Sequence, residues 1–597
     1  MKQSMKRNSS RGGLGTGLSL LLLFGALALL LWRSLYSFCW SDESFYLSTV
    51  HRFWLGDAPF MDEWNTGQLY SVLLLPFYSA WRAVVGSTEG IYLGARIAAV
   101  LLMFGESLAL WLLTRRRWPV ASLCGALLVL LYAKANLAGL SYYTLSLFFF
   151  LGGLLILYGL WERGGGTLPA HSWPCRLLLM LAGVLEAFAV VCMPFAAVLW
   201  LAALPPLFAK KLRGLRAPVL WVIGGAALAA AVYLGWTLSR VSLGEILEYL
   251  PWVLSDPDSN TVSLPVLVLK FFLQPFYQLW LGLVFWGPAL AVTLWRRLTR
   301  RPVEGRLRRW LLWAALAGFV LNILASGTMQ GRAQLAVCVL GVQCWLLCPA
   351  DKRPRRELIF FGLPGLAFAF IWQIGSNTGF SGMTLGFAAA APFGAACVEA
   401  LLRADEEETG QSVSARPLFG GFRAVTVLAV LLALPVLASG WQRVALVYRD
   451  APLEACTTRL EAGPARGLYT SAGAAQQYED LRQVLAEDES DGPLFVSALA
   501  PWAYLCTDRP VAAPTTWRVY TNSIILQGYY ERHPDKLPDT VLLLAPEMGA
   551  YVSTIQPEES PAPNAPEEGG FLMEILQKDY VQNATPAGTL YSRRTDG

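Results

Sequence analysis

Long apolar runs separated by short polar or basic segments make up most of the first 440 residues. Each run is about 17 to 23 residues long, the length that a helix needs to cross a hydrocarbon core of roughly 30 Å. Helices are expected for these runs because lipid cannot satisfy free backbone N–H and C=O groups. The pattern predicts about thirteen spans. They lie near 14–37, 91–113, 119–134, 142–160, 177–192, 194–209, 217–237, 272–295, 310–326, 333–348, 357–374, 383–402 and 423–440.

Composition agrees with a polytopic membrane protein that is mostly α-helical. Hydrophobic residues make up 55% of the chain and charged residues only 15%, whereas soluble proteins carry about a quarter charged residues. Tryptophan and tyrosine gather near the ends of the apolar runs, as interfacial anchors do. The lipid bilayer is therefore the environment in which this chain folds.

Basic residues occur in clusters between alternate spans. If the N-terminus is cytoplasmic, every cluster falls in a cytoplasmic segment, as the positive-inside rule requires. We therefore predict a multi-pass plasma-membrane protein with its C-terminus outside, and no nucleic-acid partner is needed to explain the positive charge. The first run follows basic residues like a signal peptide, but Ser37–Trp40 is a poor cleavage site, so we interpret the run as a retained span.

The composition changes after residue 440. Residues 1–440 form the predicted transmembrane domain, and residues 441–597 a predicted extracytoplasmic α/β domain, long enough for a core of its own. Within the second domain, 476–487 is expected to be a helix, and 494–498 and 541–545 are expected to be buried strands.

Cysteine usage leaves one question open. Most of the ten cysteines lie inside predicted spans, where they are interpreted as small apolar residues. Cys456 and Cys506 are the only two in the external domain. Spacing alone does not decide whether they form a disulfide.

The first external loop, 39–90, contains two acidic pairs. Asp42-Glu43 directly follows the first span, and Asp62-Glu63 comes twenty residues later. One interpretation of the first pair is a solvated helix end; the other is a site that holds a polar substrate near lipid. An apolar stretch follows at 69–81, too short to span, so we expect it to lie along the membrane surface or dip into it. A later external segment, 239–270, is expected to hold a short amphipathic helix.

The order of a first span, an Asp-Glu pair, an aromatic residue and a long loop with Gly-Asp-x-Pro and a second acid resembles the GT-C membrane glycosyltransferases. The closest resemblance is to the family-39-like branch, which includes protein O-mannosyltransferases, aminoarabinose transferases of lipid A and Rgt-type enzymes. It covers about residues 14–440 and not the external domain. It implies that Asp42, with Glu43 beside it, acts as general base in an inverting transfer from a polyprenyl-phosphate sugar to an envelope glycan, lipid or protein.

A lipid-phosphate leaving group needs positive charge and N–H donors. Arg332 is the first candidate, because it lies in a polar loop between two spans, and Lys270 is the second. The alternative for Arg332 is an interfacial anchor whose head reaches into water. Lys134 and Arg96 are weaker candidates.

Other residues are assigned to substrate binding or to structure. Asp62 and Glu63 are candidates for holding the substrate, and Asn377 could bind a sugar hydroxyl or simply belong to a turn. Glu106 and Glu186 lie within spans, where ionisable residues are costly. We interpret them as structural partners for arginine or backbone groups, and the alternative is that they are site residues.

No metal or other cofactor is predicted. Metal-using relatives carry an acid in the second external loop, where this chain has none, and the three histidines do not cluster. Asp62 and Glu63 still leave some room for an ion.

Two other functions remain as alternatives. A transporter or flippase of lipid-linked sugars is expected to show two alternating halves or charged lining along its spans, and neither is visible. An O-antigen-type polymerase or ligase is expected to carry key Arg and His residues in a large late external loop. Here the late loops are short and the large external segment is terminal.

Overall fold

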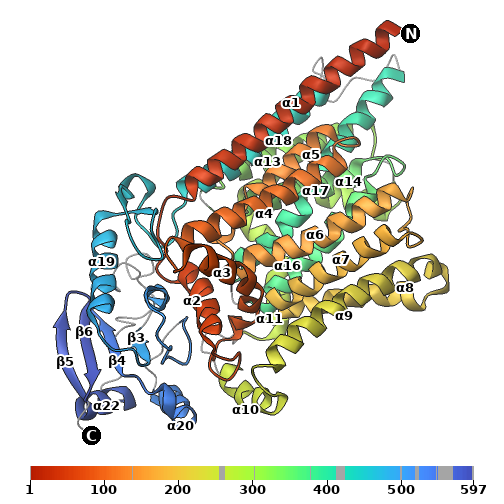
Figure 1. Cartoon of the computed structure of the whole chain (residues 1–597). Helices are drawn as coiled ribbons and strands as arrows, with labels where there is room; N and C mark the ends of the chain where they lie inside the picture. Colours follow the sequence, from red (N-terminus) through yellow and green to blue (C-terminus); the bar gives the residue numbers. More distant parts are fainter. Residues whose placement is uncertain are drawn as a thin grey trace.

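The computed structural model of the chain describes residues 2–136, 139–254, 262–301, 303–327, 329–376, 378–411, 424–497, 500–517, 523–545, 548 and 569–594. A bundle of long helices forms one part of the molecule, and a smaller domain with a sheet lies at one end of the bundle (Figure 1). The first helix and the last bundle helix lie along the same edge.

The bundle helices follow one another in the order of the predicted spans. Their bounds are α1 Lys2–Arg33, α4 Ile91–Thr114, α5 Pro119–Leu130, α6 Tyr142–Arg163, α7 Trp173–Cys192, α8 Leu204–Phe208, α9 Arg216–Leu238, α11 Leu264–Gln278, α12 Trp280–Leu298, α13 Gly305–Leu324, α14 Arg332–Leu347, α15 Arg355–Glu357, α16 Leu363–Gly375, α17 Phe380–Gln411 and α18 Ala424–Ala445. Helix α17 is packed on α5, α14 and α16, and its apolar window is entirely buried. It is the centre of the bundle.

The mostly helical, membrane-spanning class is confirmed, but about thirteen full spans is too many. Among the described residues, nine helices are long and apolar enough to cross a membrane, and α11 with α12, bent by 104°, makes a tenth if the pair is one span. Three predicted spans are shorter apolar helices: Pro119–Leu130, Pro194–Phe208 and Arg332–Leu347. Twelve residues of helix reach only about 18 Å. Hydropathy located the apolar segments, but it did not show where each helix begins and ends.

Three further helices lie at the end of the bundle that carries the small domain. They are α2 Asp42–Leu55, α3 Ser71–Val85 and α10 Leu243–Leu254. Helix α3 is the predicted apolar stretch, and its 15 residues are too few to span. Helix α10 is the predicted amphipathic helix: Tyr249 and Val253 are buried, whereas Leu247 and Leu254 are exposed.

The C-terminal domain contains the predicted helix and both predicted strands. Its helices are α19 Ala472–Glu487, α20 Ser523–Arg532 and α22 Phe571–Asp579, and its strands are β1 Thr458–Arg459, β2 Tyr469–Thr470, β3 Leu494–Val496, β4 Thr540–Leu544, β5 Tyr580–Thr585 and β6 Gly588–Arg593. The main sheet has the order β3-β4-β6-β5, with β3 and β4 parallel and the other pairs antiparallel. Cys456 and Cys506 are both free thiols.

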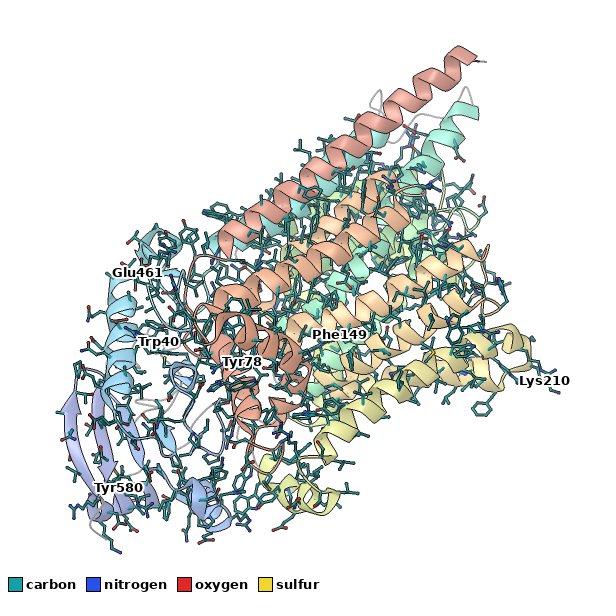
Figure 2. The ribbon with its side chains drawn as sticks, in the orientation of Figure 1. Trp40, Tyr78, Phe149, Lys210, Glu461 and Tyr580 are labelled. Atoms are coloured by element: carbon teal, nitrogen blue, oxygen red, sulfur yellow. The ribbon has the colours of Figure 1, made fainter. Side chains whose placement is uncertain are left out.

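Residues of the segment 39–90, the predicted first external loop, are packed directly against this domain. Phe38 and Trp40 join Tyr478 and Trp502 in one aromatic cluster. The backbone N–H of Ser37 also donates to a carbonyl of the C-terminal domain at 2.8 Å. Figure 2 shows Trp40 and Tyr78 on the side of the bundle that faces this domain. The loop and the domain therefore share one apolar core.

Candidate active site

Asp42 is the first residue of α2, where the positive end of the helix dipole favours a carboxylate. Its Oδ2 accepts hydrogen bonds from Arg449 Nη1 at 2.6 Å, from the Tyr448 hydroxyl at 3.1 Å and from the Ser41 hydroxyl at 3.1 Å. The Asp42 side chain is 19% exposed, whereas that of Arg449 is only 6% exposed. The carboxylate is thus held by a buried cation and still reachable from outside.

Arg449 lies in the junction between α18 and the C-terminal domain. Its backbone has φ 51°, in the left-handed region that non-glycine residues seldom adopt. The next residue, Asp450, accepts from the Phe38 N–H and from the Thr470 hydroxyl. The contacts of Asp450 hold the junction in place. In the strained backbone conformation of Arg449, its guanidinium lies against Asp42.

Glu43 has different surroundings from Asp42, although the two are adjacent. Arg96 of α4 donates to both Glu43 carboxylate oxygens, at 2.6 and 2.5 Å, and the two side chains are 4% and 5% exposed. The remaining Arg96 N–H groups donate to carbonyls of residues 34–37. Glu43 and Arg96 thus fasten the chain after α1 to α4, and neither has a free face for a substrate.

Three further cations lie close to the Asp42 pair. Arg33 and Arg443 line a small pocket together with Tyr448, and Arg443 and Lys134 line a second small pocket; each has room for about one water molecule. Within the described part of the chain, no carboxylate lies within ion-pair distance of these three cations. Arg443 Nε is buried without a hydrogen-bond partner there. The region therefore has surplus positive charge.

Lys134 lies in the short segment between α5 and α6, with its ammonium 3.2 Å from the centre of the Tyr143 ring. Burial lowers the pKa of Lys134 to about 7, and the negative charge of Asp42 partly opposes that shift. Tyr142 stacks on Trp372 and packs at a tilt against Tyr143, so that aromatic rings form one wall beside this lysine. Lys134 therefore loses its charge at lower pH than an exposed lysine does.

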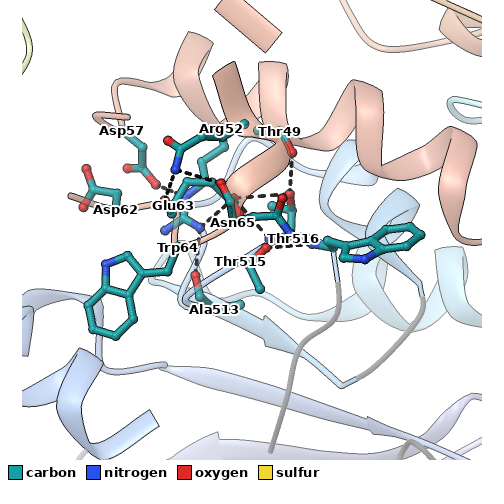
Figure 3. A network of polar contacts seen from close by, with 12 residues as sticks. Thr49, Arg52, Asp57, Asp62, Glu63, Trp64, Asn65, Ala513, Thr515 and Thr516 are labelled. Atoms are coloured by element: carbon teal, nitrogen blue, oxygen red, sulfur yellow. Dashed lines mark hydrogen bonds and ion pairs between the residues drawn. The ribbon is translucent and has the colours of Figure 1, made fainter. Parts of the chain in front are cut away.

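The second acidic pair belongs to a different network, at the other end of α2 (Figure 3). The guanidinium of Arg52, which is 0% exposed, donates to Asp57 at 2.5 Å, to Glu63 at 3.2 Å and to the Tyr529 hydroxyl at 2.7 Å. Glu63 also accepts from the backbone N–H of Thr516 at 3.2 Å. These bonds join the first loop to the C-terminal domain.

Burial raises the pKa of both Asp62 and Glu63. Asp62 accepts from the Ala58 N–H at 2.7 Å and faces His533 at 3.9 Å. Ten residues of α2 separate Asp42 from Arg52, about 15 Å along the helix. The two acidic pairs are therefore not brought into one site.

Among the described residues, no group of three or more His, Cys, Asp or Glu is placed to hold a metal ion.

The other predicted site residues are scattered. Arg332 begins α14 and donates to Gln278 at 3.0 Å and to the Ala325 carbonyl at 3.3 Å. Lys270 is exposed on α11, and neither residue lines the two pockets near Asp42. Asn377 lies outside the described residues.

The sequence interpretation missed Arg33, Arg443, Tyr448 and Arg449. Arg33 ends α1 and Arg443 lies in the last turn of α18, and Arg449 follows soon after. A signal for them existed, because arginines on the predicted outer side run against the positive-inside bias.

No protein-family model matches the chain, and no curated protein matches it. Solved structures of the oligosaccharyltransferase AglB from Archaeoglobus fulgidus are similar over most of the chain. One, in complex with an inhibitory peptide and a dolichol-phosphate, is 13% identical, covers 97% of this chain and 74% of its own, and has a TM-score of 0.45. The apo form is 14% identical over the same shares, with a TM-score of 0.44. These likenesses are too distant to carry an argument about function.

Proposed function

We propose that this chain is a membrane glycosyltransferase that moves a sugar from a polyprenyl-phosphate donor to a hydroxyl of an envelope glycan, lipid or protein on the outer face. The observation that carries the proposal is the Asp42 carboxylate, fixed by Arg449 and Tyr448 next to pockets with surplus positive charge. A GT-C-type arrangement, with the C-terminal domain outside, is part of the proposal.

Asp42 acts as the general base. The acceptor oxygen attacks the anomeric carbon and gives its proton to Asp42 Oδ, while the bond between that carbon and the phosphate oxygen breaks. The phosphate leaves with the bonding electrons, so the products are an inverted glycoside and a polyprenyl phosphate. Arg449 stabilises the carboxylate before transfer, and one ionised oxygen remains free of the arginine to accept the proton.

The leaving phosphate needs positive charge that is already in place before the reaction, so that no group has to reorient as the negative charge develops. Arg443 and Lys134 supply it from the two pockets, and the apolar side chains of Leu30, Met103 and Leu147 line the pocket beside Lys134. This assignment replaces Arg332 and Lys270 with cations that lie nearer to the proposed base.

The experiment uses the purified full chain in vesicles with labelled polyprenyl-phosphate sugars and an extract of envelope glycans, lipids and proteins. We expect label to enter an acceptor with inversion at the anomeric carbon. Retained configuration would contradict the role of Asp42. Label that crosses the bilayer with no product would replace the proposal with a flippase.

A further inference from the structure

A third cavity is lined by residues of α4, α6 and α7 that do not line the two pockets near Asp42. It is a groove of about 310 Å³ between α4, α6 and α7, and apolar side chains such as Leu155, Ile156 and Leu185 form most of its wall. Gly152 and Gly159 of α6 lie along it, and the lack of side chains there leaves the groove its width. The proposed transfer reaction uses none of these residues.

Glu106 projects into this wall from the middle of α4. The residue is 5% exposed, and neither carboxyl oxygen has a hydrogen-bond partner among the described residues. The expectation of an arginine or backbone partner for Glu106 is therefore wrong. An isolated carboxylate at this depth is very costly, so the group carries its proton. Its O–H then needs an acceptor, which the surrounding apolar side chains cannot provide.

Arg163 marks one end of the groove. It is the last residue of α6 and exposed, and no described carboxylate lies within ion-pair distance of it. This end of the bundle lies away from the C-terminal domain, as Figure 1 shows for the connection between α6 and α7. Eleven residues separate Gly152, beside Glu106, from Arg163, about 16 Å along the helix. A ligand held at both must be elongated and apolar, with an anionic end and an acceptor further along.

We propose that this groove is a binding site for an anionic glycerophospholipid of the cytoplasmic leaflet. The phosphate pairs with Arg163, an acyl chain fills the groove, and an ester carbonyl accepts from protonated Glu106. The polyprenyl-phosphate donor does not fit this role. Its phosphate must reach Asp42 at the opposite end of the bundle, and its isoprene chain contains no oxygen that could accept from Glu106.

The test is native mass spectrometry of the full chain, purified in detergent and exchanged with equal amounts of phosphatidylglycerol and phosphatidylethanolamine. We expect one phosphatidylglycerol to be retained per chain. Arg163→Gln should lower its retention about tenfold, Glu106→Leu should lower it several-fold, and Ile156→Trp, which fills the groove, should abolish it. Lys210→Gln is the matched control, because Lys210 is an exposed cation at the same end of the bundle (Figure 2) but does not line the groove.

Unchanged retention in Arg163→Gln and Ile156→Trp would overturn the proposal, as would equal retention of the two lipids by the wild-type chain. A small membrane protein that copurifies in place of lipid would overturn it in favour of a partner helix. Ile156→Trp should leave the melting temperature within a few degrees of wild type in lipid-free detergent, which separates loss of binding from loss of fold. The outcome does not depend on whether sugar transfer is observed.

Discussion

The two ends of α2 carry chemically similar groups in opposite situations. At its start, Asp42 faces a single buried arginine and remains 19% exposed. At its end, Arg52 is fully buried and bonded to two carboxylates, a tyrosine hydroxyl and the Ala513 carbonyl. The sequence presents both acidic pairs as candidates for substrate contact. Burial and hydrogen-bond partners distinguish the two ends. Asp42 is partly exposed and has a carboxylate oxygen that Arg449 does not use, so it can react. The bonds of Arg52 join the first loop to the C-terminal domain, so they stabilise the fold.

Arg52→Met should produce the largest effect, and on stability. It leaves Glu63 without a cation in a buried interface, while Asp57 keeps its ion pair with Lys536, and an uncompensated buried charge costs roughly 3–5 kcal/mol. Thermal unfolding and protease digestion should show release of the C-terminal domain. A melting temperature equal to that of wild type would show that the Arg52 network does not stabilise the fold, and would contradict its structural role.

His51, in the middle of α2, makes the interface sensitive to acid. Burial lowers the pKa of His51 to about 4, and its ring is placed as a neutral imidazole that donates to the Thr507 carbonyl and accepts from the Tyr78 hydroxyl. The unfolded chain binds a proton near pH 6.5 and the folded chain does not. Stability from this group is therefore present above pH 6.5 and falls by about 3 kcal/mol as the pH drops to about 4.

His51→Gln should remove that part of the pH dependence, measured as the melting temperature between pH 7.5 and 4.5. The raised pKa values of Asp62 and Glu63 act in the opposite direction, so the difference between wild type and variant isolates the histidine. Parallel curves for the two proteins would show that His51 does not stay neutral when folded.

Arg449→Met should act on catalysis more than on stability. Without this guanidinium, the Asp42 carboxylate is neither oriented nor stabilised, and we expect kcat/KM to fall about 100-fold, in the range of general-base effects. Arg82→Met is the control, since Arg82 pairs with the half-exposed Asp508. Equal losses of activity in the two variants would mean that Arg449 has no special relation to the reaction.

The sequence predicted the parts of the fold that depend on local pattern. Apolar runs located the bundle helices, and the apolar segments around 494–498 and 541–545 located β3 and β4. The contact between Arg449 and Asp42 joins positions 407 residues apart, so no local pattern could reveal it. Glu43 is a similar case, because only the position of Arg96 after folding shows that both its oxygens are in use.

Lys134→Arg should have a smaller effect, visible in the pH profile. With a pKa of about 7, Lys134 loses its charge as the pH rises above neutrality, so the KM for the phosphate donor should rise several-fold between pH 6 and 8.5. Arginine keeps its charge throughout and should flatten this rise. A profile that is the same in both proteins would exclude Lys134 from phosphate binding.

Chelation of divalent metal should change the transfer rate least. In the proposed reaction, Arg443 and Lys134 already provide the positive charge that a metal would bring to the phosphate. The rate in EDTA should stay within twofold of the rate in Mg²⁺ or Mn²⁺. A large loss that is restored by added metal would show that these cations are insufficient.

The central claim is tested most directly by single-turnover sugar transfer with Asp42→Asn and Asp62→Asn, the same chemical change made at each acidic pair. Both proteins are compared at equal amounts of folded chain. We predict that Asp42→Asn slows transfer about 1,000-fold or more, within the range for loss of a general base, while Asp62→Asn stays within a few-fold of wild type. Transfer at the wild-type rate by Asp42→Asn, or an equal loss in both variants, would contradict the account.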